Sequence, residues 1–152
     1  MKRFFFLVLT AVLLFSCTSR SEANIAEETM RAFFSALANG NYESAASMYG
    51  GGYEELAQMN PDIAQTDYAI LWKNGCEFNG FVCMEVLDVV SVTEGASQIE
   101  FNITFKTKDG GLFQFTGCCG ETLPEPITKY AIIVRADAAG KYKVNSMPPY
   151  VP

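Results

Sequence analysis

Cysteine is the residue type in this chain whose number and spacing most directly suggest chemistry. The five cysteines are Cys17, Cys76, Cys83, Cys118 and Cys119. In an oxidising compartment the last four would form two disulfides, for which three connectivities are open. We favour cross-links from Cys76 and Cys83 to the 118–119 pair, because adjacent cysteines bond to each other only through a strained ring. Each such link would close a loop of roughly forty residues and contribute on the order of 4 kcal/mol.

Metal and redox chemistry fit these spacings less well. Cys76 and Cys83 are seven positions apart and Cys118 and Cys119 are adjacent, whereas structural zinc sites use pairs two to four residues apart. The Cys-x-x-Cys motif of disulfide exchangers is also missing, although a strained bond between Cys118 and Cys119 would be easily reduced. We therefore expect no metal and no cofactor.

Carboxylates and tyrosines are the remaining groups that could catalyse a reaction. The chain has no histidine, which removes the commonest general base and excludes Ser-His-Asp and Cys-His arrangements. Asp88 interrupts the apolar segment Met84–Val92. In one strand register Asp88 faces the interior, where burial would raise its pKa and make it a candidate base. In the other register it faces solvent, and we favour this second interpretation. The hydroxyl groups that could assist a buried Asp88 belong to Tyr53, Tyr68 and Tyr130.

The N-terminus has the pattern of an export signal. Lys2 and Arg3 precede an apolar run at 4–15, which is too short to span a bilayer. Leu14-Phe-Ser-Cys17 resembles the lipobox of bacterial lipoproteins, a class in which the cysteine is acylated and becomes the first mature residue. The resemblance implies a signal peptide at 1–16, a lipid-bearing tether at 17–23 and a membrane anchor at Cys17. Two or more acyl chains hold a protein stably at a membrane. By the same resemblance, Thr18 after the cysteine favours sorting to the outer membrane. The alternative to a lipoprotein signal is an ordinary secretory signal, with Cys17 in a disulfide.

Length and charge limit what the rest can be. The chain has 152 residues, 49% of them hydrophobic, and a net charge of −6. Without residues 1–16 it holds 9 basic and 17 acidic groups. This acidic balance excludes a nucleic-acid-binding module that relies on phosphate contacts. Twelve Phe and seven Tyr exclude general disorder and are enough for the core of one domain.

Helices are expected in the first half. Asn24 and Glu27 have the spacing of a capping box, and apolar residues then recur at helical steps as far as Asn39-Gly40. The expected stripe consists of Ile25, Thr29, Ala32, Phe33, Ala36 and Leu37. A second helix is predicted over Tyr42–Tyr49, ended by three glycines, and a third from Pro61 to about Lys73, closed by Asn74-Gly75, with Trp72 as a core anchor.

Strands are expected from residue 81 onward. Gln98–Lys106 alternates strictly between polar and apolar residues, which is typical of a strand with one buried face. Further strands are predicted at Met84–Val92, Leu112–Thr116, Thr128–Ala136 and Lys141–Ser146. Helices followed by an antiparallel meander predict an α+β fold, in which the N-terminal helices pack on a curved sheet.

The segment 27–56, with Phe33-Phe-Ser-Ala-Leu37, Asn39-Gly-Asn-Tyr42 and Ala45-Ala-Ser-Met-Tyr49, resembles the opening helices of the nuclear transport factor 2-like superfamily. This superfamily includes ketosteroid-isomerase-like and SnoaL-like proteins and has a cystatin-like fold. The resemblance implies a cone-shaped domain over 24–152 with a pocket at its open end. We therefore expect a lipid-anchored, extracytoplasmic domain that binds a small apolar ligand or an envelope protein without catalysis. The alternative is a small isomerase or dehydratase that uses a pocket carboxylate.

Overall fold

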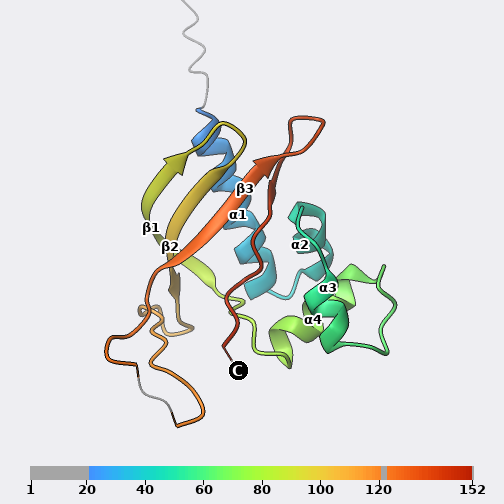
Figure 1. Cartoon of the computed structure of the whole chain (residues 1–152), viewed down its shortest axis with the longest axis vertical. Coiled ribbons are helices and arrows are strands. Elements are labelled where there is room, and N and C mark those ends of the chain that lie inside the picture. The colour runs from blue at the N-terminus through green and yellow to red at the C-terminus, as the bar shows by residue number, and fades with distance from the viewer. Residues whose placement is uncertain (1–20, 121–122, 152) are drawn as a thin grey trace, which may run out of the picture.

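Helices occupy the first half of the chain and strands the second, as the sequence predicts (Figure 1). The structure, a computed structural model, describes residues 21–120 and 123–151. Cys17, the predicted signal peptide and most of the predicted tether lie outside the described residues. The helices are α1 (Glu22–Ala38), α2 (Tyr42–Met48), α3 (Glu54–Met59) and α4 (Tyr68–Glu77). The strands are β1 (Glu85–Glu94), β2 (Ile99–Lys106), β3 (Tyr130–Ala136) and β4 (Tyr142–Val144). They form one antiparallel sheet in the order β1-β2-β3-β4.

Helix α1 begins earlier than predicted. The side chain of Ser21, not that of Asn24, caps the helix by accepting a hydrogen bond from the Asn24 amide. The buried stripe is also shifted by one residue in its first two turns, where Ala26 and Met30 are buried and Ile25 is exposed. Thus α1 starts inside the segment expected to be a tether, and its contact with the sheet begins almost immediately after the start of the described chain.

Helix α4 differs most from the prediction. Residues 61–67 form turns, and the helix starts only after Asp67, whose side chain accepts a hydrogen bond from the Ile70 amide. The helix then continues through Gly75, which was expected to end it. A Cβ at Gly75 would lie 2.7 Å from the Leu56 side chain. This glycine therefore allows α3 and α4 to approach closely and does not terminate the helix.

Strand β1 departs from simple alternation because it contains two β-bulges. Val86, Val89 and Val92 pair with Phe105, Ile103 and Phe101, while Leu87 and Val90 are the extra residues. The predicted strand at 112–116 is wrong: that segment forms only isolated bridges, Lys106 with Leu112 and Phe115 with Ile127. The described sheet consequently has four strands instead of five.

Aromatic side chains fill the space between the helices and the sheet. Phe34 of α1 meets Phe105 of β2 with ring centroids 5.0 Å apart, and Phe33 meets Trp72 of α4 at 5.5 Å. Trp72 is fully buried, so its predicted role as a core anchor is confirmed. The largest fully buried side chains are those of Trp72, Phe33, Phe34, Phe101, Phe105, Met30, Leu37, Leu56, Leu71, Ile103, Ile132 and Val134. The interior that the sheet and α1 enclose is thus packed with side chains.

Candidate functional site

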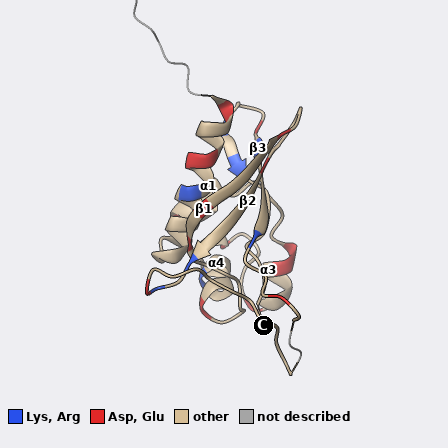
Figure 2. Ribbon diagram, turned by 90° about the vertical axis from the view of Figure 1, so that its left-hand side faces the viewer, with Lys and Arg blue, Asp and Glu red and all other residues tan. Residues whose placement is uncertain are grey.

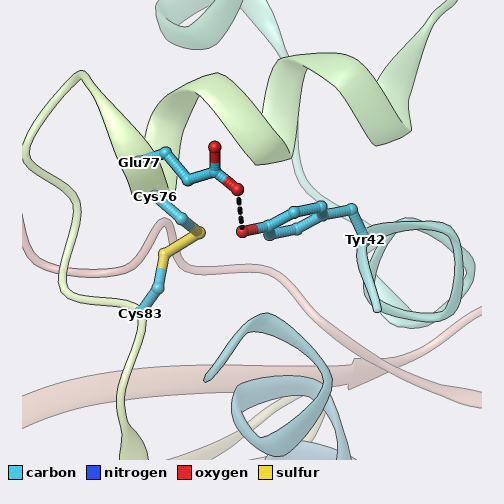
Figure 3. The surroundings of a disulfide bond; sticks show 4 residues. All are labelled: Tyr42, Cys76, Glu77 and Cys83. Atoms are coloured by element: carbon cyan, nitrogen blue, oxygen red, sulfur yellow. Dashed lines mark hydrogen bonds between the residues drawn. A yellow bond between two sulfur atoms is a disulfide. The ribbon is translucent and has the colours of Figure 1, made fainter. Parts of the chain in front are cut away.

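The disulfide joins Cys76 to Cys83, so the cross-links expected from these residues to the 118–119 loop are wrong (Figure 3). The two Cα atoms are 5.4 Å apart, because the chain turns back immediately after α4. In Figure 3 the Glu77 carboxylate, next to the disulfide, accepts a hydrogen bond from the Tyr42 hydroxyl at 3.2 Å. The bond and this contact tie the end of α4 to the segment before β1 and to α2. Cys119 is exposed and has a positive φ of 57°, in a loop remote in sequence from this bridge.

Asp88 lies on the exposed face of β1. It pairs with Thr104, whereas its neighbour Val89 pairs with the fully buried Ile103 on the opposite face. Its carboxylate accepts a hydrogen bond from the Val89 amide at 2.9 Å. The solvent-facing register is therefore correct for Asp88, although Leu87 is exposed as well. Asp88 lines neither of the two cavities described below.

The tyrosines that could have assisted Asp88 lie elsewhere. Tyr130 packs against Phe105 and Phe113, and its hydroxyl donates a hydrogen bond to the Ile127 carbonyl. Tyr53 and Tyr68 lie in the helical layer, directly before α3 and at the start of α4. The structure thus separates these hydroxyls from Asp88 and brings Tyr53 and Tyr68 together.

An open groove of about 710 Å³ lies beside α3 and the turns that lead to α4. Its lining combines aromatic rings, a carboxylate, amide and hydroxyl groups, and backbone. The lining residues are Gly51, Gly52, Tyr53, Glu54, Ala57, Gln58, Pro61, Ile63, Gln65, Thr66 and Tyr68. A concave site with aromatic walls and a few convergent polar groups is the usual form of a small-molecule site.

A stacked tyrosine pair forms one wall of this groove. The rings of Tyr53 and Tyr68 have centroids 4.2 Å apart and planes inclined by 25°. Tyr53 is held from behind, because its hydroxyl accepts a hydrogen bond from Trp72 Nε1 at 3.1 Å. Tyr68 is 42% exposed. The pair therefore has one ring fixed to the core and one ring available to a ligand.

The glycines at 50–52 do more than end α2. A Cβ at Gly51 would collide with the Tyr49 hydroxyl, and one at Gly52 would collide with the Glu54 carboxylate. The Tyr49 hydroxyl instead donates a hydrogen bond to the Gly52 carbonyl at 3.1 Å.

Burial, with smaller contributions from Tyr53, Glu54 and Glu55, raises the pKa of Tyr49 to about 12. Burial also raises the pKa of Tyr53. Both rings remain neutral phenols at neutral pH.

From the sequence, Tyr53 and Tyr68 were predicted only as possible partners of Asp88, and the groove was not predicted. One signal was present: three consecutive glycines directly before Tyr53 allow backbone and side chains to approach closely. The remaining lining residues were not predicted, because residues 61–67 were expected to be part of a helix over Pro61–Lys73. Because 61–67 forms turns, Pro61, Ile63, Gln65 and Thr66 can line a cavity.

A smaller cavity of about 480 Å³ lies among Met59, Phe78, Asn79, Gly80 and Tyr150. Phe78 is 76% exposed there. The C-terminal segment reaches this region by pairing with the chain before β1, since the Val82 amide bonds to Pro149 and the Val151 amide to Gly80. This segment therefore packs against the domain.

Metal ligands are not clustered in the part of the chain that the structure describes: no group of three or more His, Cys, Asp or Glu side chains could hold an ion there. Within residues 21–120 and 123–151, no helix has the length and apolarity needed to cross a bilayer. The chain matches neither a protein-family model nor a curated protein.

Proposed function

We propose that this chain is a lipid-anchored, extracytoplasmic binding domain that takes a small ligand into the groove beside α3 and does not catalyse a reaction. The observation that carries the proposal is the Tyr53–Tyr68 pair, stacked at 4.2 Å on the wall of a cavity of about 710 Å³. Ligand pockets are typically of this size. The lining contains Glu54, Gln58 and Thr66 as well as rings, so it favours an amphipathic ligand over the purely apolar one expected from the sequence.

The arrangement of α1 on the sheet is compatible with the cone of the nuclear transport factor 2-like superfamily, which we retain as the proposed fold family. In its enzymes the cone holds a carboxylate base. Here the corresponding interior is filled by Phe33, Phe34 and Phe105, and Asp88 is exposed on the outer face. These two observations favour binding at the open groove over catalysis inside the cone.

The anchor is tested by metabolic labelling with an alkyne analogue of palmitate. We expect label on the wild-type protein and none on a Cys17→Ser variant, which has lost the acylated thiol. An unlabelled wild-type protein would contradict the lipid anchor.

The groove is tested by native mass spectrometry of the processed protein purified in detergent. We expect a co-purified small molecule that is lost in Tyr68→Leu and retained in Asp88→Asn. Tyr68 is partly exposed and Asp88 lies on the sheet, so both variants should fold. A molecule lost from Asp88→Asn and retained by Tyr68→Leu would show that binding occurs elsewhere.

A further inference from the structure

The groove lies in a segment without positive charge. Between Arg31 and Lys73 the chain contains no lysine or arginine, but it contains the carboxylates of Glu43, Glu54, Glu55, Asp62 and Asp67. Acidic positions lie in the first turn of α3 (Figure 2). A groove in this environment favours a cationic over an anionic ligand.

The nearest lysines are directed elsewhere. Lys143 packs beneath Gly50, where a Cβ would lie 2.7 Å from the Lys143 Cβ, and its ammonium donates a hydrogen bond to the Ser47 carbonyl. Lys73 lines a different cavity, with Tyr42 and Ile70. Among the described lining residues of the groove, Glu54 is the charged side chain, and no basic residue neutralises it from within the lining.

The tyrosine pair supplies the second half of a cation site. The faces of aromatic rings carry negative potential, and a cation within about 6 Å of a ring centroid is attracted to it. Tyr68 stacks on Tyr53, which Trp72 holds by a hydrogen bond, so the exposed ring is backed by a fixed one. A ring that is already ordered loses little conformational entropy when a ligand binds.

We propose that the groove binds a small soluble organic cation with an alkylated ammonium group, which lies against the ring of Tyr68 near the carboxylate of Glu54. The proposal rests on the proposed function and adds the ligand class. An alkylated ammonium group suits this lining better than a metal ion does. Its methyl groups would pack on the ring of Tyr68 and on Ile63, and its positive charge is spread over those methyl groups. A hydrated metal ion would need several oxygen ligands.

The test is a calorimetric titration of the processed protein, in a detergent without choline, with choline chloride and with 3,3-dimethylbutan-1-ol. These two molecules have nearly the same shape, but only choline is charged. We expect choline to bind about 2- to 30-fold more tightly, the range of cation–π attraction from exposed to desolvated sites. Equal affinity, or tighter binding of the neutral alcohol, would overturn the proposal.

Four variants locate the site. Tyr68→Leu and Glu54→Gln should each weaken choline binding severalfold, whereas Tyr68→Phe should bind choline like the wild type, since it keeps the ring. Glu94→Gln, which removes another exposed carboxylate at the end of β1, should leave binding unchanged. Choline affinity that is unchanged in both Tyr68→Leu and Glu54→Gln would place the cation outside the groove and overturn the proposal.

Phosphocholine separates a free cation from a lipid headgroup. Its phosphate would lie in the acidic groove, so we expect weaker binding than for choline; tighter binding would overturn the assignment to a free cation. If neither choline nor the alcohol binds, but the co-purified molecule is still lost in Tyr68→Leu, the cation assignment alone is wrong. If no molecule is retained and no probe binds, the proposed function is wrong as well.

Discussion

The disulfide between Cys76 and Cys83 gives a stability prediction whose magnitude follows from the loop that it closes. The two cysteines are seven positions apart. In the loop-entropy model, closing a loop this short stabilises the fold by about 2.4 kcal/mol, against about 4 kcal/mol for a loop of forty residues. The Cys76→Ser/Cys83→Ser variant should therefore lose about 2.4 kcal/mol of unfolding free energy. For a domain of this size that loss lowers Tm by roughly 9 °C.

The assay is urea denaturation of the protein, followed by the fluorescence of Trp72, the single tryptophan of the chain. Trp72 is fully buried, so its emission should shift to longer wavelength on unfolding. The matched control is Cys119→Ser, which should change stability by less than about 1 kcal/mol, because this exposed cysteine does not bond to Cys76 or Cys83. If the control loses as much as the first variant, or the first variant loses nothing, the short disulfide is wrong. Peptide mapping without reduction would then identify the true pairing.

Three further predictions test the helical layer around the groove. Gly75→Ala should destabilise the protein by about 1 kcal/mol in urea denaturation, because crowding of Leu56 outweighs the gain in helix propensity; a more stable variant would contradict the close approach of α3 and α4. Tyr53→Phe should cost about 1–3 kcal/mol in the same assay, because it leaves Trp72 Nε1 without its acceptor; an unchanged midpoint would contradict that hydrogen bond. Between pH 10 and pH 12 the unfolding free energy should fall as pH rises, because Tyr49 ionises near 10 when unfolded and only at about 12 when folded. That decline should be shallower in Tyr49→Phe, and an identical decline would contradict the raised pKa.

The parts of the fold that were predictable are those in which local periodicity and tertiary packing agree. Gln98–Lys106 alternates strictly, and β2 buries Ile99, Phe101, Ile103 and Phe105 on one face as that alternation requires. Helix α2 likewise begins at the predicted Tyr42, with Asn41 as its cap. In such segments a single pattern determines both the element and its buried face.

The errors arose where a contact distant in sequence decides the local structure. Two bulges let β1 pack Val86 and Val89 against the core, a spacing of three that matches neither strand register considered. Gly75 was expected to end a helix because glycine usually does so, but its role is set by Leu56, nineteen residues earlier. Cross-links to the 118–119 loop were expected because, with two disulfides, a bond between Cys76 and Cys83 would leave Cys118 and Cys119 to bond through a strained ring. The turn after α4 nevertheless brings Cys76 and Cys83 together.

Contacts between separate segments also create the candidate site, so the sequence did not predict it. Asp88 was a candidate base because a carboxylate within an apolar strand suggests burial. A bulge on each side of Asp88 leaves it on the exposed face. Tyr53 and Tyr68 gain their significance only from the turns at 61–67, which hold the start of α4 against the residue that precedes α3. Since large aromatic side chains fill the interior behind the sheet, the ligand that we propose is expected at the surface of the helical layer. There the close packing permitted by Gly51, Gly52 and Gly75 positions the groove walls. We therefore expect the specificity of the proposed binding to depend on the 50–68 segment much more than on the sheet.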